Sequence, residues 1–229
     1  MKRRLVTPGK ARRHEAVDLE GVFSIMQMSL ATISSVFMKK TGWIVGATLA
    51  ALCVFPTMVS AHIIPGSPHG FHDGFLHPLT GFDHLLAMVA VGLWASQQRG
   101  RAVWLIPLTF VSVMTLGGAL GLAGYYLPGA ELGIVASVLV LGGLIATMTR
   151  FQPSVAMLLV GWFALFHGYA HGLEMPAATG AYSFSAGFVS ATLLLHAAGL
   201  ALGMALKNER AVRWTGVSIA LSSLCLLAN

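Results

Sequence analysis

Two short stretches hold most of the side chains that could do chemistry. The first, HPLTGFDH at 77–84, lies where a long apolar run begins, and the second, FHGYAHGLE at 166–174, lies where another ends. An ionisable side chain inside a membrane-spanning segment is costly, so its default interpretation is functional. Together the stretches supply four imidazoles and two carboxylates: His77, Asp83, His84, His167, His171 and Glu174. We expect these six side chains to converge into one site.

Helical spacing within each stretch favours this convergence. His77 and His84 are seven residues apart in the sequence, which is two turns of a helix, so one continuous helix would place them on nearly the same stripe. His167 and His171 are four residues apart and share a face, and Glu174 returns to that face one turn later. The sequence therefore predicts that both groups lie near the outer end of their helices.

The donor types indicate which ligand such a site would take. Imidazole nitrogens with carboxylate oxygens suit borderline divalent ions such as Ni²⁺, Co²⁺, Zn²⁺ and Cu²⁺, whereas Mg²⁺ and Ca²⁺ prefer more oxygen ligands. The two cysteines, Cys53 and Cys225, lie in separate apolar runs and form no paired-thiolate motif. His196 stands alone in another apolar run, where it is either a further ligand or a structural hydrogen-bonding group.

Composition indicates that the solvent of this chain is lipid. Of its 229 residues, 56% are hydrophobic and only 10% are charged, against about 25% charged residues in ordinary soluble domains. The net charge of +6 does not indicate a nucleic-acid partner, because eight of the fourteen Lys and Arg residues precede residue 41 and the others fall in short gaps. The sequence contains no glycine-rich nucleotide-binding motif, so any transport would draw on a gradient or on a partner chain.

The pattern of residues 1–76 predicts a targeting sequence followed by a polar segment. Residues 38–61 combine a charged head, an apolar core and small residues before a cut at Ala61–His62, as a secretory signal peptide does. Residues 1–37 then precede the true start at Met38, as an extension or a dispensable leader. The alternative is that 38–61 remains as an uncleaved first helix. A histidine-rich extracytoplasmic segment follows at 62–76, and its side chains either collect metal or form a solvated tail: His62, His69 and His72.

Six apolar runs near the ~20 residues of a bilayer crossing follow. We place them at 79–96, 103–123, 132–149, 154–171, 184–206 and 212–228. Residues 77–229 are thus predicted to form an all-α, polytopic membrane domain of six transmembrane helices after the cleavable signal peptide. The later Lys and Arg residues fall only in alternate connections, which we assign to the cytoplasm. Both mature termini would then face out of a bacterial cytoplasmic (inner) membrane.

Pairs of small residues recur inside three of these runs. Glycines lie four apart at 117 and 121 and at 199 and 203, and a further pair stands at 142 and 143. Small residues let helix backbones approach closely. We interpret these glycines as contacts between helices of one chain.

The two stretches also carry a family resemblance. Residues 77–84 resemble the HPxxGxDH motif of the HupE/UreJ family, and residues 166–174 are similar to its FHGxAHGxE motif, with a match at every fixed position. The resemblance covers the chain from the signal peptide onward. It implies a nickel permease that supplies the maturation of hydrogenase or urease, although some relatives are associated with cobalt. It also implies that the six residues named at the outset are the functional ones. We expect the metal to be a transported ion and expect no prosthetic group.

Two other functions remain open from the residues alone. An intramembrane metal-dependent hydrolase would also gather His and Asp near one membrane face, with Glu174 as its general base. An accessory protein could bind the metal without transporting it. We expect a permease rather than an enzyme, with a divalent transition-metal ion and the lipid bilayer as its partners.

Overall fold

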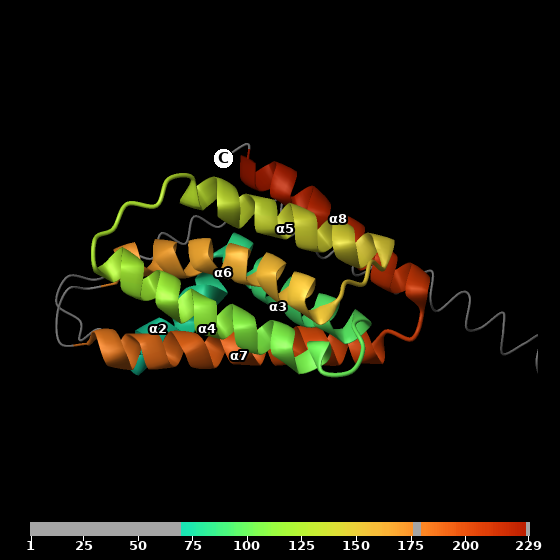
Figure 1. Cartoon of the computed structure of the whole chain (residues 1–229), viewed down its shortest axis with the longest axis horizontal. Helices are drawn as coiled ribbons and strands as arrows, with labels where there is room; N and C mark the ends of the chain where they lie inside the picture. Colours follow the sequence, from blue (N-terminus) through green and yellow to red (C-terminus); the bar gives the residue numbers. More distant parts are fainter. Residues whose placement is uncertain (1–69, 176–179, 228–229) are drawn as a thin grey trace, which may run out of the picture. The chain divides into compact units, whose positions relative to one another are not determined.

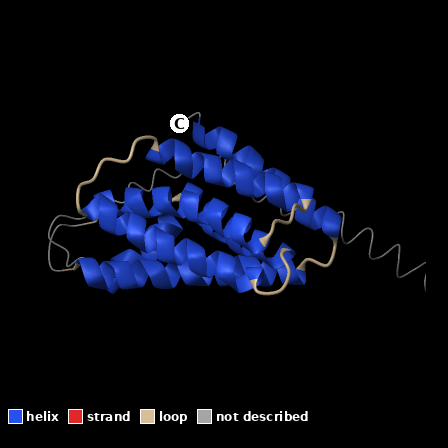
Figure 2. Ribbon diagram, in the orientation of Figure 1, coloured by secondary structure: helices blue, strands red, loops and turns tan. Residues whose placement is uncertain are grey.

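The structure is a computed structural model that describes residues 70–175 and 180–227, and every described element is a helix. The extension at 1–37, the signal peptide at 38–61, and His62 and His69 lie outside the described residues, so these assignments stay predictions. Figures 1 and 2 show the helices, whose bounds are α2 (Phe71–Thr80), α3 (Phe82–Gln97), α4 (Ala102–Leu122), α5 (Ala130–Thr147), α6 (Pro153–Glu174), α7 (Ala181–Ala205) and α8 (Glu209–Leu227). The expected all-α class is confirmed for this part of the chain.

Four of the described helices are long and apolar enough to cross a bilayer: α4, α5, α6 and α7. The pair α2 and α3 makes a fifth crossing if the two helices count as one broken span. The chain is therefore a multi-pass membrane protein. α8, which covers most of the predicted sixth span, is 19 residues long but is not among the helices that pass this test. The count of six spans stays a prediction.

The first predicted span is not continuous. The chain bends by 87° between α2 and α3, at Gly81, whose backbone is extended (φ −87°, ψ 115°). The expectation of one uninterrupted helix over 79–96, with His77 and His84 on a single stripe, was wrong. Pro78 removes a backbone donor near the end of α2, and glycine is about 1 kcal/mol less favourable than alanine in a helix. The missing donor at Pro78 and the low helix propensity of Gly81 together favour a helix end at this point.

α3 occupies the centre of the bundle. It contacts α7, α5 and α4 along its length, and Figure 1 shows it covered by its neighbours. Its apolar residues are almost all buried: Leu86, Ala87, Met88, Ala90, Val91, Leu93, Trp94 and Ala95. This helix thus meets protein rather than lipid on nearly every side.

Glycines set the closest helix contacts, as the sequence predicted. A Cβ at Gly117 or Gly121 of α4 would overlap the backbone of α6, and one at Gly199 of α7 would overlap the carbonyl of Val89 in α3. Gly142 of α5 is pressed in the same way against α8. Gly143 is the exception, because a Cβ there would meet nothing within 4 Å. The glycines therefore pack α6 closely against α4 and α3 closely against α7, and α3 and α6 carry five of the six candidate site residues.

Candidate metal site

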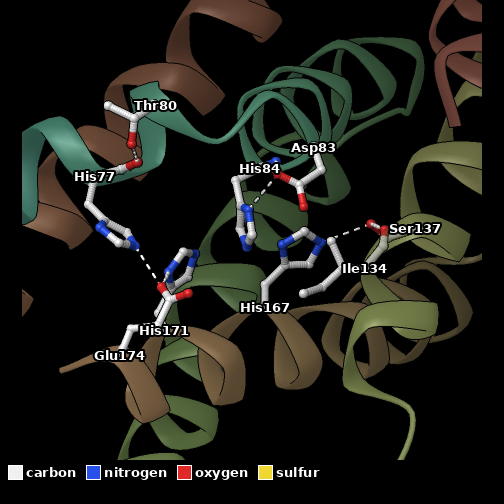
Figure 3. A network of polar contacts seen from close by, with 9 residues as sticks. All are labelled: His77, Thr80, Asp83, His84, Ile134, Ser137, His167, His171 and Glu174. Atoms are coloured by element: carbon white, nitrogen blue, oxygen red, sulfur yellow. Dashed lines mark hydrogen bonds and ion pairs between the residues drawn. The ribbon is translucent and has the colours of Figure 1, made fainter. Parts of the chain in front are cut away.

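The structure brings all six predicted side chains together (Figure 3). His77 comes from α2, Asp83 and His84 from the first turn of α3, and the other three from the last turns of α6. The ring centroid of His171 lies 4.8 Å from that of His77 and 4.2 Å from that of His84. His84 and His167 are 5.0 Å apart by the same measure. Although the helix breaks at Gly81, the bend turns α2 so that His77 still faces α6.

Three of these residues gather around the exposed Glu174 carboxylate, and we call them the outer group: His77, His171 and Glu174. His77 Nε2 lies 2.9 Å from Glu174 Oε2, and His171 Nδ1 lies 3.5 Å from the same oxygen. Their ligand atoms all lie within 4.8 Å of one another. Because metal–nitrogen bonds are about 2.1 Å long, ligand atoms on opposite sides of one ion are about 4 Å apart. Small side-chain movements would therefore let these three groups hold one cation.

Asp83, His84 and His167 form the second group, which we call the inner group because it leads to the fully buried His167. Asp83 Oδ1 accepts hydrogen bonds of 2.8 Å from both the backbone N–H and the ring Nδ1–H of His84. A carboxylate cannot donate when ionised, so Nδ1 carries the ring proton and Nε2 carries the lone pair. Such carboxylate–histidine pairs orient imidazoles that bind metals. His84 Nε2 is buried and has no hydrogen-bond partner within the protein.

His167 completes the inner group, and Ser137, which was not among the predicted site residues, orients its ring. The hydroxyl of Ser137 in α5 donates to the Ile134 carbonyl at 2.6 Å. Its single proton is then used, so it accepts from His167 Nε2–H at 2.8 Å. His167 Nδ1 therefore carries a lone pair, and this nitrogen is also buried without a partner. The only sequence signal for Ser137 was one hydroxyl within an apolar run.

The cluster contains buried imidazole nitrogens without hydrogen-bond partners, which a bound cation would satisfy. His84 Nε2, His167 Nδ1 and both ring nitrogens of His171 are buried without hydrogen-bond partners. Leaving a buried polar group unsatisfied costs roughly 1–3 kcal/mol, and most such groups in native proteins have partners. A divalent cation accepts several lone pairs at once, so one bound ion would satisfy His84 Nε2, His167 Nδ1 and the one His171 nitrogen that carries a lone pair, while the other His171 nitrogen carries the ring proton.

Two further histidines lie outside the cluster. His196 of α7 is 2% exposed and donates from Nδ1 to the carbonyl of Met88 at 2.8 Å. His72, at the start of α2, is well exposed and lies 3.7 Å from Asp73. The structure therefore joins neither of these two candidate ligands to the six residues above.

Comparison with known proteins identifies the family of this chain. A family model described as HupE / UreJ protein matches residues 49–226, a range that includes both motif stretches. The chain belongs to the HupE/UreJ family. It is 42% identical over 190 residues to "Protein HupE" of Rhizobium leguminosarum bv. viciae, an alignment that covers 80% of this chain and 96% of that protein. No solved structure matches the chain at a comparable level.

The HupE/UreJ resemblance drawn from the two motifs is thereby confirmed. In this HupE/UreJ chain the motif residues supply nitrogen and oxygen donors, with Asp83 and Ser137 holding two of the rings in defined tautomers. Binding of a borderline divalent ion is the chemistry that this arrangement can perform. That the six residues are metal ligands stays a prediction.

Proposed function

We propose that this protein is a permease that moves Ni²⁺ across the bacterial cytoplasmic membrane, with Co²⁺ as the alternative ion. The imported ion would supply the maturation of a metalloenzyme, hydrogenase or urease. The observation that carries the proposal is the cluster of unpaired imidazole nitrogens between apolar helices. Membership of the HupE/UreJ family supports it.

Exposure within the cluster gives the ion a direction of travel. The side chain of Glu174 is 58% exposed and that of Asp83 30%, against 20% for His77, 12% for His84 and 4% for His171, while His167 is fully buried. An ion would first meet the carboxylates and His77 and would reach the fully buried His167 last. His171 lies beside both His77 and His84, so it can bind the ion during this transfer.

Ligand type sets the selectivity of this route. Each imidazole replaces one water of the hydrated ion, and the two carboxylates supply negative charge without forming an oxygen-rich cage. Ni²⁺ and Co²⁺ accept this mixed set, whereas Mg²⁺ dehydrates reluctantly and prefers oxygen. Protons compete for the same lone pairs, so acidification weakens ion binding.

Reconstitution of the purified protein into liposomes tests the proposal. Wild-type liposomes loaded with a fluorophore that nickel quenches should admit Ni²⁺, and Asp83→Asn and His167→Ala should each reduce the initial rate about tenfold or more. Thr115→Ala is the matched control, because Thr115 is exposed and its hydroxyl donates to the Val111 carbonyl of its own helix. Wild-type liposomes that stay closed to Ni²⁺ would refute the permease.

The same preparation separates the two other functions. A metal-binding accessory protein would bind Ni²⁺ but leave the liposomes impermeable to it. An intramembrane hydrolase would keep a stoichiometric metal after chelator treatment, whereas a permeant ion should wash out. Metal content before and after chelation therefore accompanies the flux measurement.

A further inference from the structure

His196 has the same unusual feature as the cluster but lies apart from it. Within residues 70–175 and 180–227, the buried side-chain nitrogens and oxygens without a hydrogen-bond partner are His84 Nε2, Gln97 Oε1, His167 Nδ1, His171 Nδ1, His171 Nε2 and His196 Nε2. All but the Gln97 oxygen belong to imidazoles. Only one of these imidazoles, that of His196, is outside the two groups already described.

The backbone of α3 fixes which nitrogen of His196 is available. Its Nδ1–H donates to the Met88 carbonyl at 2.8 Å, so Nε2 carries the lone pair. α3 and α7 approach closely at this level, since a Cβ on Gly92 would overlap the carbonyl of His196 itself. The ring is thus held between the two helices. His196 is 2% exposed, and its Nε2 has no hydrogen-bond partner within the described residues.

Helix geometry places His196 one step deeper than the inner group. Phe188 of α7 packs on His171, with ring centroids 4.3 Å apart. His196 follows Phe188 by two turns of α7, or about 12 Å, whereas His167 precedes His171 by one turn of α6, or about 6 Å. α6 and α7 run in opposite directions (Figure 1), so both steps lead away from the exposed outer group. His196 is therefore about one turn beyond His167.

One aromatic side chain bridges the two imidazoles. The ring of Phe110 in α4 lies 5.6 Å from that of His167 and 5.1 Å from that of His196, edge-on to the latter at 86°. Phe110 is fully buried. An ion leaving His167 in this direction would pass this ring before it met the next nitrogen lone pair.

We propose that His196 is a second metal-binding position, which takes the divalent ion from the inner group past Phe110. The proposal rests on the permease function for its cargo but assigns a distinct step to a residue outside both motifs. The six motif residues bind the ion as it enters, and its onward passage depends on His196 Nε2. The alternative role for His196 is a helix–helix hydrogen bond to Met88 and nothing more.

His196→Asn separates these roles. The amide nitrogen of asparagine can take the place of Nδ1 and keep the bond to Met88, but no atom replaces Nε2. We expect the Kd of the purified protein for Ni²⁺ to change less than about twofold and Tm to stay close to that of the wild type. Nickel influx into liposomes should fall about tenfold or more. Thr192→Val, one turn away on α7 and also buried, is the control for a general disturbance of this helix and should keep wild-type influx.

Each result decides between the roles. Influx in His196→Asn equal to the wild type would overturn the proposal, and so would a fall in influx matched by a fall in Tm, because both outcomes reduce His196 to a packing residue. Wild-type liposomes without influx would instead refute the permease itself. Loss of influx at unchanged Kd and Tm supports the second position.

Discussion

At the scale of single residues, the site depends on which ring nitrogen carries the proton. Asp83, Ser137 and the Met88 carbonyl each contact one nitrogen of a different imidazole, and in each case the opposite nitrogen is left with its lone pair. Neutral imidazole has one donor and one acceptor nitrogen, so these partners decide where the metal can bind. The partners come from α3 and α5 and set up the rings without themselves being imidazoles.

Ser137 gives the sharpest test of this arrangement. Ser137→Ala leaves His167 Nε2–H buried without an acceptor, so we expect a loss of roughly 1–3 kcal/mol in stability. Nickel affinity should fall about tenfold, because the ring is free to turn or change tautomer. Thermal unfolding in detergent and calorimetric titration with Ni²⁺ measure the two effects. Unchanged affinity in this variant would contradict the orienting role of Ser137.

At the scale of helices, α4 and α6 hold the site through glycine contacts. A Cβ at Gly168 would overlap the Met114 carbonyl, and one at Gly172 would overlap the Gly118 carbonyl. These glycines flank His171 in the sequence and lie on the face of α6 that meets α4. The position of the imidazoles thus depends on how closely two backbones approach.

Gly168→Ala should separate α4 from α6. We expect a loss of about 1–3 kcal/mol from the forced backbone shift and weaker nickel binding, because His167 and His171 move with α6. Gly143→Ala is the matched control: a Cβ there meets nothing within 4 Å, so stability should stay equal or rise by up to about 1 kcal/mol. Measurement of Tm for both variants tests this expectation. An equal fall in Tm for Gly168→Ala and Gly143→Ala would contradict the importance of close packing at Gly168.

The sequence predicted the helices of the described region better than the details of the site. Apolar runs and motif spacing located α4 to α7 and the six side chains, because lipid requires long apolar helices and binding requires polar groups within them. The break at Gly81 was missed because hydropathy treats 79–96 as one run. Ser137 and Met88 could not be identified, because their roles depend on helix register across the bundle, which local sequence does not determine.

At the scale of the whole molecule, charge predicts orientation. The connections α3–α4, α5–α6 and α7–α8 lie at one end of the bundle (Figure 1) and hold the basic residues Arg99, Arg101, Arg150 and Lys207. The positive-inside rule assigns this end to the cytoplasm. The outer group, from α2 and the carboxyl-terminal end of α6, would then face the exterior.

Reporter fusions test this orientation. Alkaline phosphatase, which is active only outside the cytoplasm, should be active when fused after Asn229 and inactive when fused after Gly100, between two arginines. The first fusion also tests whether α8 crosses the membrane. The reverse pattern would contradict the predicted topology and with it the external entry of the ion.

The central place of α3 has a consequence for how the protein is made. α3 is synthesised early, yet α7, against which it packs, is among the last helices to leave the ribosome. Until then the face of the nascent α3 that later packs on α7, which includes Gly92, can contact only the translocon or lipid. Membrane insertion and metal binding are thus linked. A chain that ends before α7 would carry Asp83 and His84 on a helix without one of its main packing partners.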